Sequence, residues 1–454
     1  MTSAGTSSPR TPTRDDLMLD SLFEFIEASP SPFHAAATAV DRLAAAGFVE
    51  TGRGESWSEL DVVQGFAVRD GGTVVAVRAG AAVDPERLRF SVIGAHTDSP
   101  NLRLRPRPDS STLGYRQLGA EIYGGVLLNS WLDRDLGLSG RVAVHDGTEG
   151  DADGGSGARA RPIIVLWRCD RALLRVPQLA IHLDRDVNDG LKLDRQQHMT
   201  PVWGLGDPTP DGFRHFLAAE LDVEPDAVLS WDVMAHDLTP PARLGRGGEM
   251  YAAGRIDNLA SCHAAVEALA GLSAVPDNAA AVVVLFDHEE IGSDSATGAG
   301  SPILADALER IAAALGADRS QYLRAVARSL CVSADGAHAV HPNYPERHEP
   351  GHMPMLNAGP VIKSNVNVRY ATDARTSARF AAACNAAGVP HQIYSHRGNL
   401  PCGSTIGPIT ASRLGMSVVD VGSPMLSMHS ARELGGSDDP AMLTAALGAF
   451  LADG

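Results

Sequence analysis

Apolar residues in the first hundred positions recur at spacings that predict two helices followed by strands. Leu17–Phe25 and Phe33–Leu43 carry them at intervals that mostly fit amphipathic helices, with a break at the Pro30–Pro32 pair. Gly72–Arg78 and Leu88–Ala95 are β-rich runs, and the second is largely apolar throughout. Such a run is typical of a central strand covered by helices on both faces. We therefore expect both helices to pack on a sheet.

A similar alternation of helical and strand-like segments returns after residue 254. Helices are predicted at 258–272, 303–315 and 377–387. Strands are predicted at 279–286, 330–333 and 417–421. The alternation predicts an α/β fold with a mixed, largely parallel sheet and helices on both of its faces.

The stretch from residue 102 to 244 has a different texture, with short β-like pieces and many turns. It includes the low-complexity segment Gly147–Pro162, which we expect to be a surface loop. We interpret 102–244 as an inserted β-rich domain, and 14–101 together with 245–454 as the catalytic domain. Residues 1–13 are rich in Ser, Thr and Pro and have little to bury, so a disordered tail is expected there.

Composition and charge exclude several classes of protein. Hydrophobic residues make up 44% of the 454 positions and charged residues 20%, which is the balance of a folded globular protein. The formal net charge of −17 repels phosphate backbones and anionic lipid, so neither nucleic acid nor a membrane is expected as a partner. The N-terminal residues lack the apolar run of a signal peptide. Five cysteines without a C-x-x-C pair fit a reducing cytoplasm.

Several strong apolar runs end in residues that can bind metals. These residues are His96 and Asp98, the Asp287–Glu290 group, Asp335 and His429. In open α/β sheets, residues from separate strands converge at the carboxyl edge, where ligands bind. A fifth group, Gly254–Asn258, precedes a long Ala-rich helix and places Asp257 near a helix N-terminus. The coincidence indicates a metal centre, because ionisable groups are costly to bury unpaired.

The types of these side chains indicate which metal and which reaction. Imidazole and carboxylate ligands without thiolate suit a zinc-like divalent ion, although Mn²⁺ and Co²⁺ can occupy similar sites. Two ions that share a bridging carboxylate need about five protein ligands, which the chain can supply. Glu289 and Glu290 are adjacent, so their side chains diverge. One can bind a metal while the other faces the bound water as a general base.

Five ordered segments resemble the aspartyl aminopeptidases. They are His96–Leu102, Gly254–Leu259, Asp287–Ser293, His338–Tyr344 and Met428–Glu433, within a likeness that runs from about Phe23 to Phe450. The resemblance implies a binuclear zinc aminopeptidase fold with an inserted dimerisation domain. It also implies a homodimer as building block, assembly into a tetrahedral homododecamer, and removal of N-terminal Asp or Glu from peptides.

The same resemblance implies two metal sites that share one carboxylate, with Asp257, Glu290 and His429 at one ion and His96, Asp257 and Asp335 at the other. Glu289 is then the general base. Asp98 is a carboxylate that orients His96, as metal-bound imidazoles commonly require. Gly336 departs from the family, in which Met more usually follows the aspartate, but the change removes no ligand.

Further residues are assigned to substrate on the same basis. Lys363 matches the lysine of the family's side-chain pocket, although most lysines lie on the surface. Composition alone would make His182 a half-buried sheet histidine, whereas the resemblance implies that it reaches into the neighbouring subunit's site. His341 is expected close to the site. Cys402 is interpreted as a loop thiol rather than a nucleophile, because no activating Cys-His pair can be read from the sequence.

These observations predict a metal-dependent exopeptidase. Two alternatives remain open: a broad-specificity aminopeptidase or deacylase on the same scaffold, and a catalytically silent assembly protein. Rates on N-terminal Asp, Glu, Leu and acylated substrates would separate the enzymes. The intact ligand set argues against a silent protein, which has no need for so many clustered carboxylates.

Overall fold

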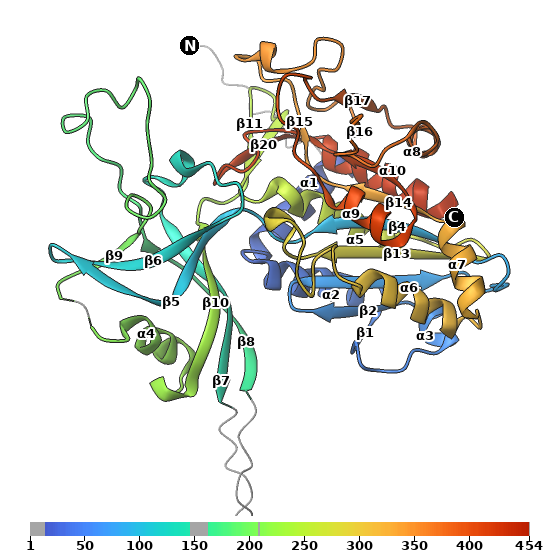
Figure 1. The fold of residues 1–454 in the computed structure, drawn as a ribbon, viewed down its shortest axis with the longest axis horizontal. Coiled ribbons are helices and arrows are strands. Elements are labelled where there is room, and N and C mark those ends of the chain that lie inside the picture. Colours follow the sequence, from blue (N-terminus) through green and yellow to red (C-terminus); the bar gives the residue numbers. More distant parts are fainter. Residues whose placement is uncertain (1–13, 146–161, 208, 454) are drawn as a thin grey trace, which may run out of the picture.

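A computed structural model describes residues 14–145, 162–207 and 209–453 of the chain. The predicted tail at 1–13 and nearly all of the predicted loop at 147–162 lie outside the described residues. These described residues form three sheets and ten α-helices, arranged as two lobes with the larger lobe around the nine-stranded sheet (Figure 1).

The largest sheet has nine strands in the order β1-β2-β3-β13-β4-β14-β18-β16-β17. In that order they span Val49–Thr51, Phe66–Asp70, Thr73–Ala79, Ala279–Phe286, Arg89–His96, Leu330–Ala334, Ser417–Gly422, Val361–Ser364 and Gln392–Ser395. The four central strands, β13, β4, β14 and β18, are all parallel to their neighbours within this group. Antiparallel pairs occur between β2 and β3, β3 and β13, and β18 and β16. The predicted mixed, largely parallel sheet is therefore confirmed.

Helices cover both faces of this sheet, as the sequence predicts. One face carries α1 (Arg14–Ala28), α2 (Pro32–Ala45), α5 (Ile256–Ala270), α8 (Ala374–Ala386) and α10 (Asp439–Asp453). The other carries α3 (Glu59–Gln64), α6 (Ile303–Ala314), α7 (Arg319–Arg328) and α9 (Ile406–Leu414). Alternate residues of β13 enter different cores: Val283 packs with the first group and Val282 with the second. Burial on both faces explains why this strand is apolar at every position.

Capping residues fix where the helices begin. The Ser31 side chain accepts a hydrogen bond from the His34 amide, and Pro32 occupies the first turn of α2, where its missing N–H costs nothing. Asp373 and Thr376 form a capping box at α8, with the Thr376 amide donating to Asp373 at 2.7 Å. This box explains why α8 begins three residues before the predicted start at 377.

A second sheet is entirely antiparallel and has the order β8-β7-β10-β5-β6-β9. These strands span Pro162–Leu174, Leu136–His145, Val228–Asp237, Asn101–Thr112, Tyr115–Tyr123 and Val202–Leu205. Helix α4 (Gly212–Leu221) and the short helix η1 (Leu128–Trp131) contribute to its core, and the short helix η2 (Pro225–Ala227) leads into β10. This sheet forms the lobe at the left of Figure 1. The division of the chain into two domains remains a prediction.

A third sheet, in the order β11-β12-β20-β19-β15, completes the fold. Its strands span Ala242–Leu244, Met250–Ala253, Glu433–Gly436, Pro424–Leu426 and Ala337–His338. Two short helices, η3 (Glu289–Ile291) and η4 (Pro345–Arg347), lie in loops. None of the helices that the structure describes is long and apolar enough to cross a membrane.

Candidate active site

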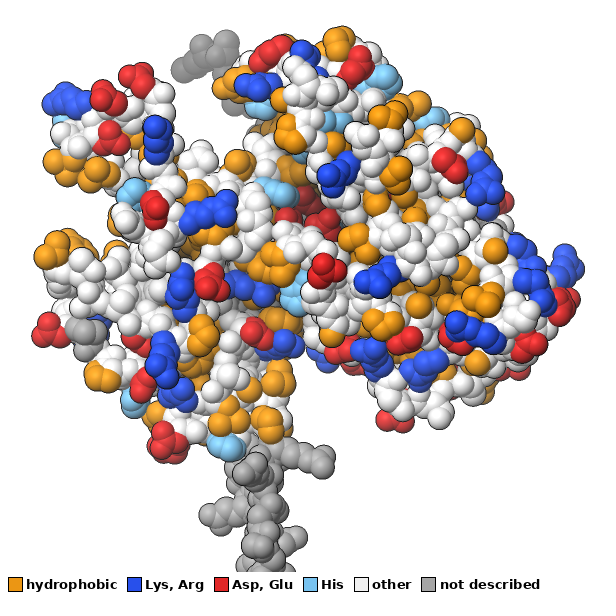
Figure 2. Space-filling model, in the orientation of Figure 1, with side chains coloured by type: hydrophobic (Ala, Val, Ile, Leu, Met, Phe, Trp, Pro, Cys, Tyr) orange, Lys and Arg blue, Asp and Glu red, His pale blue; other side chains and the backbone are white. Residues whose placement is uncertain are grey.

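The carboxyl edge of the nine-stranded sheet gathers the predicted metal ligands. β4 ends at His96 and β13 at Phe286, and these two residues are paired in the parallel register. Asp335 directly follows β14, and Asp257 lies in the first turn of α5. His429 follows β19 of the third sheet rather than β18, because the last predicted apolar run is divided between two sheets. Figure 2 shows acidic side chains at the bottom of a hollow between the two lobes.

Two groups of potential ligands share Asp257. His96 Nε2 lies 3.4 Å from Asp257 Oδ1 and 3.4 Å from Asp335 Oδ1. His429 Nε2 lies 3.5 Å from Asp257 Oδ2 and 3.4 Å from Glu290 Oε1. The two oxygens of Asp257 thus face different histidines. This is the arrangement that a carboxylate bridging two cations requires.

The distances within each group fit zinc coordination. Zinc–ligand bonds of about 2.0–2.1 Å place neighbouring ligand atoms of a tetrahedron about 3.3–3.4 Å apart. The closest histidine–carboxylate separations in both groups lie at 3.4–3.5 Å. Asp257 Oδ1 and Glu290 Oε1 are also buried without a hydrogen-bond partner. Because unpaired buried carboxylate oxygens are costly, these atoms are suited to hold a cation.

Crowded carboxylates make protonation of the metal-free site favourable. Burial and the neighbouring Asp257 raise the pKa of Glu290 well above its usual value. Burial, with Asp335 and Asp98 adding to it, raises the pKa of Glu289 to about 8. Divalent cations reverse this repulsion, because a bound cation is the largest local charge in such a site. The residues present therefore fit a zinc-type metal centre.

Both histidines present the same ring nitrogen to the cluster. The Nδ1 atom of His96 lies 3.0 Å from the Asp98 carbonyl oxygen, and the Nδ1 atom of His429 lies 3.1 Å from the Gly125 carbonyl oxygen. A carbonyl can only accept, so each Nδ1 carries a proton and each Nε2 is the ring atom that would bind a metal.

The Asp98 carboxylate contacts the backbone of the predicted base, Glu289, and of the predicted ligand Glu290. Its Oδ1 atom lies 3.4 Å from His96 Nδ1 and accepts a hydrogen bond from the Glu289 amide at 3.1 Å. Its Oδ2 atom accepts from the Glu290 amide at 3.1 Å and from the Tyr123 hydroxyl at 2.6 Å. Burial alone would raise the pKa of Asp98, but His96 and Tyr123 outweigh it and the pKa is lowered. Asp98 therefore stays ionised and holds the Glu289–Glu290 backbone.

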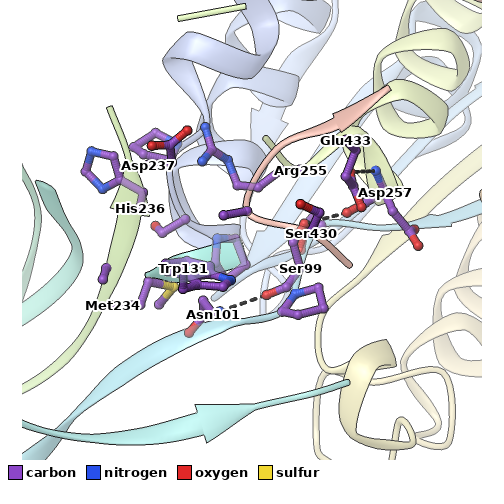
Figure 3. Close-up of a pocket in the computed structure, with 17 residues that line it drawn as sticks. Ser99, Asn101, Trp131, Met234, His236, Asp237, Arg255, Asp257, Ser430 and Glu433 are labelled. Carbon is purple, nitrogen blue, oxygen red and sulfur yellow. Dashed lines mark hydrogen bonds between the residues drawn. The ribbon is translucent and has the colours of Figure 1, made fainter. Parts of the chain in front are cut away.

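Glu433 has a comparable role that the sequence did not reveal. Its Oε2 atom accepts a hydrogen bond from the Asp257 amide at 2.9 Å, and its Oε1 atom accepts from the His429 amide at 2.7 Å. Figure 3 shows the contact with Asp257 beside a small cavity. Burial and nearby Asp257 raise the pKa of Glu433 to about 8. The only signal in the sequence was its place in the segment Met428–Glu433, where it has no ligand spacing of its own.

Tyr123 was also missed, and it lies in the stretch 102–244 that we interpret as an inserted domain. Tyr123, the last residue of β6 in the second sheet, donates its hydroxyl to Asp98. A single tyrosine at the end of a strand forms no sequence pattern that would place it beside Asp98, 25 residues earlier in the chain.

A pocket of about 230 Å³ opens beside the cluster and has Lys363 in its wall. Lys363 is only 2% exposed, and its Nζ atom donates to the carbonyl oxygens of Asp335 and Gly336, both at 3.1 Å. Nζ also lies 3.5 Å from Asp335 Oδ2 and faces the Tyr370 ring. An ammonium has three donors: two meet the carbonyl oxygens, and the third has the Asp335 carboxylate within ion-pair distance.

Gly336 lies in the same pocket wall, at the position where this chain departs from the family. A Cβ atom there would lie 2.8 Å from Met425 Sδ and 3.0 Å from Met428 Cε. Two methionines thus occupy the space in front of Gly336. With glycine at this position, the neighbouring Asp335 still lies within its ligand group. The difference from the family therefore removes no ligand.

Three other residues belong to none of the ligand groups among the described residues. His182 is exposed, in a turn of the second lobe, so it is not the half-buried sheet histidine that composition suggests. His341 accepts a hydrogen bond from the Asn343 amide and packs on Tyr344, outside the residues that line the pocket. Cys402 is a free thiol whose pKa is raised by burial, which does not suit a nucleophile.

An α/β sheet whose carboxyl edge carries a buried histidine–carboxylate cluster beside a pocket defines a metallohydrolase. Residues 25–451 match the family described as Aminopeptidase I zinc metalloprotease (M18). A probable M18 family aminopeptidase 2 of Streptomyces coelicolor is 50% identical over 438 residues, which cover 95% of this chain and 97% of the relative. The chain therefore belongs to the M18 family of zinc aminopeptidases, and the family resemblance seen in the sequence is confirmed.

Solved structures are similar over nearly the whole chain. A chain in the cryo-EM structure of the Ape4 and Nbr1 complex has a TM-score of 0.90 and 35% identity, covering 97% of this chain and 86% of its own length. The S. cerevisiae mApe1 dodecamer has a TM-score of 0.81 and 25% identity, covering 96% of both chains. The zinc aminopeptidase fold is therefore confirmed.

Proposed function

We propose that this chain removes N-terminal Asp or Glu from peptides with the help of two zinc ions. Asp257, whose two oxygens face different histidines, is the observation that supports a binuclear centre. His96 and Asp335 would complete one site, and Glu290 and His429 the other. Zinc bound there supplies Lewis-acid activation of water and of the scissile carbonyl.

Glu289 acts as the general base in this proposal. Its Oε2 atom lies 3.9 Å from His96 Nε2, farther than the ligand oxygens, so it borders the cluster without completing it. Glu289 accepts a proton from the attacking water and donates it to the leaving amine. Asp98 fixes the Glu289 backbone during this transfer through the 3.1 Å hydrogen bond from its amide.

Lys363 supports selectivity for acidic residues. Arginine supplies nearly all of the 38 Lys and Arg side chains, and the only lysines are Lys192 and Lys363. Lys363 is a buried cation in the pocket wall, and a positive charge there suits a substrate carboxylate. The net charge of −17 does not oppose this, because distant charges are screened beyond about 8 Å at physiological salt.

Lys363→Met is expected to lower kcat/KM for N-terminal Asp by about 10- to 150-fold. A desolvated hydrogen bond to a charged group contributes roughly 1.5–3 kcal/mol, which corresponds to that range. N-terminal Leu should be affected much less. The measurement is the Asp-to-Leu ratio of kcat/KM in the variant and the parent. Lys192→Met is the matched control, because Lys192 is exposed in the second lobe. An unchanged ratio in Lys363→Met would show that acidic selectivity arises elsewhere.

The same assay tests the alternative functions. Comparable rates on Asp, Glu and Leu peptides would indicate a broad-specificity aminopeptidase. Preference for acylated amino acids would indicate a deacylase, and absence of hydrolysis in zinc-loaded protein would indicate an assembly protein. The five free cysteines agree with the reducing cytoplasm in which we propose that the enzyme works.

We further propose that the chain assembles as dimers, and as a homododecamer built from them. One similar structure is a dodecamer of mApe1. In this chain Leu179, Ile181 and Leu183 are 56%, 51% and 74% exposed on either side of His182. These exposed apolar residues support an interface with a second copy at this loop, and His182 would then complete a partner subunit's site.

Mixing His182→Phe protein with Glu289→Gln protein is expected to restore activity. Each variant is inactive alone, but a mixed dimer contains one site with both an intact Glu289 and a partner's intact His182. Activity of the mixture relative to each variant is the measurement, after conditions that exchange subunits. Full activity of a verified monomer would refute this role of His182.

A further inference from the structure

We infer that the segment from Tyr123 to Leu127, at the end of β6, is a positioning element of the metal centre. It belongs to the lobe whose expected role is assembly, yet it contacts residues on both sides of the cluster. The inference rests on the proposed function, because it deepens the account of that same site.

Tyr123 positions the Asp98 side of the centre. Its hydroxyl donates to Asp98 Oδ2 at 2.6 Å, and both side chains are buried, at 6% and 0% exposure. Arg103 lies over the Tyr123 ring, with Cζ 3.7 Å from the ring centre, and holds it in place. Because Asp98 also accepts from the Glu289 and Glu290 amides, the hydroxyl fixes the carboxylate that orients both glutamates.

The two glycines that follow position the other side. Gly124 has φ +75°, and a Cβ atom there would lie 3.1 Å from the Glu290 Cβ atom. Only glycine allows this backbone to lie so close to Glu290 in that conformation. The Gly125 carbonyl accepts from His429 Nδ1 at 3.1 Å, and the Leu127 amide donates to the His429 carbonyl at 3.1 Å. The ring and the backbone of His429 are therefore both fixed by this segment.

A purely structural role of this segment predicts different results from a positioning role. If the segment only joined the two lobes, changes in it would lower thermal stability and leave zinc affinity unchanged. If it positions Asp98, Glu290 and His429, the same changes weaken zinc binding even where the fold is intact. Partners that orient metal ligands typically change metal affinity or activity by about 10- to 100-fold when removed.

Tyr123→Phe tests the first contact with little disturbance, because the ring and its stacking with Arg103 remain. We expect zinc affinity, measured by competition with a chelator, to fall by about 10- to 100-fold. We expect kcat to fall with little change in KM. Tyr322→Phe is the matched control, since Tyr322 is 5% exposed and donates its hydroxyl to the Ala305 carbonyl at 3.2 Å, in α7. It should leave zinc affinity and kcat unchanged.

Gly124→Ala tests the second contact against Gly114→Ala. Both glycines have positive φ, +75° and +85°, so both substitutions strain the backbone in the same way. A Cβ at Gly114 meets nothing within 4 Å, whereas one at Gly124 meets Glu290. We expect Gly124→Ala to weaken zinc binding by at least about 10-fold and Gly114→Ala to leave it unchanged.

The inference is refuted if Tyr123→Phe and Gly124→Ala bind zinc and turn over substrate as their controls do, whatever their melting temperatures. Should Gly124→Ala fail to fold, Tyr123→Phe decides alone. Zinc affinity is measured without peptide, so it remains informative if the proposed function is wrong. A parent protein that binds zinc but hydrolyses no peptide would refute the proposed function. The comparison of zinc affinity between the variants and their controls would remain valid.

Discussion

Glu289→Gln is expected to keep its zinc and lose at least about 10²-fold in kcat, the usual scale for a general base. The amide has nearly the shape of the carboxylate and cannot accept the proton. The backbone contact with Asp98 is unaffected, because it is made by the Glu289 amide. The measurements are zinc content, kcat and KM of the purified variant. Glu50→Gln, at a surface ion pair with Arg69, is a control for loss of a carboxylate and should behave as the parent.

Glu290→Gln separates the two adjacent glutamates. Glu290 faces His429, so its substitution should reduce zinc content rather than turnover by the zinc-loaded fraction. In the same structure, His96, Glu289 and Glu290 also lie close enough together to hold a metal ion. If Glu289→Gln lost zinc as readily as Glu290→Gln, Glu289 would be a ligand and another residue would have to accept the proton. Near-normal turnover by Glu289→Gln would contradict its assignment as the base.

The central fold and the metal cluster could be predicted because buried strands appear in the sequence as continuous apolar runs. β13 packs into cores on both faces, so all eight of its residues are apolar and the ionisable residues after it are conspicuous. His96 is the last residue of the buried strand β4, and Glu290 and Asp335 come after the buried strands β13 and β14. Asp257 lies in the first turn of an Ala-rich helix whose residues are almost all buried, so this ionisable residue stands out in the sequence in the same way.

The long-range contacts of Glu433 and Tyr123 with these residues correspond to no pattern in the sequence. Glu433 reaches Asp257 across 176 residues, and Tyr123 reaches Asp98 from a different sheet. Their positions depend on how three sheets pack, which no periodicity in the sequence encodes. The placement of His429 shows the same limit, because its apolar run is divided between β18 and β19 of different sheets. Sequence patterns therefore pointed to the candidate ligands and to Asp98 but missed Glu433 and Tyr123.

Asp257→Ala is expected to remove both zinc ions, whereas other ligand substitutions should remove one. One Asp257 oxygen faces His96 and the other faces His429, so each proposed zinc site uses one of them. Loss of Asp257 therefore leaves each site with two protein ligands. Asp335→Ala should empty only the His96 side, and His429→Ala only the Glu290 side. Zinc content should thus fall from two ions per chain to about none, one and one. Metal analysis after dialysis against a defined free zinc concentration measures these values.

Asp439→Asn is the matched control for this series. Asp439 is a buried carboxylate that accepts a hydrogen bond from the Asn357 amide at 2.9 Å, apart from the ligand groups. Its substitution should lower the melting temperature and keep both zinc ions. Zinc binding should also strengthen as pH rises, because metal ligands must be deprotonated and burial raises the pKa of Glu290. An Asp257→Ala protein that retained one zinc ion with parental affinity would show that Asp257 serves a single site, and the binuclear centre would need a different bridge.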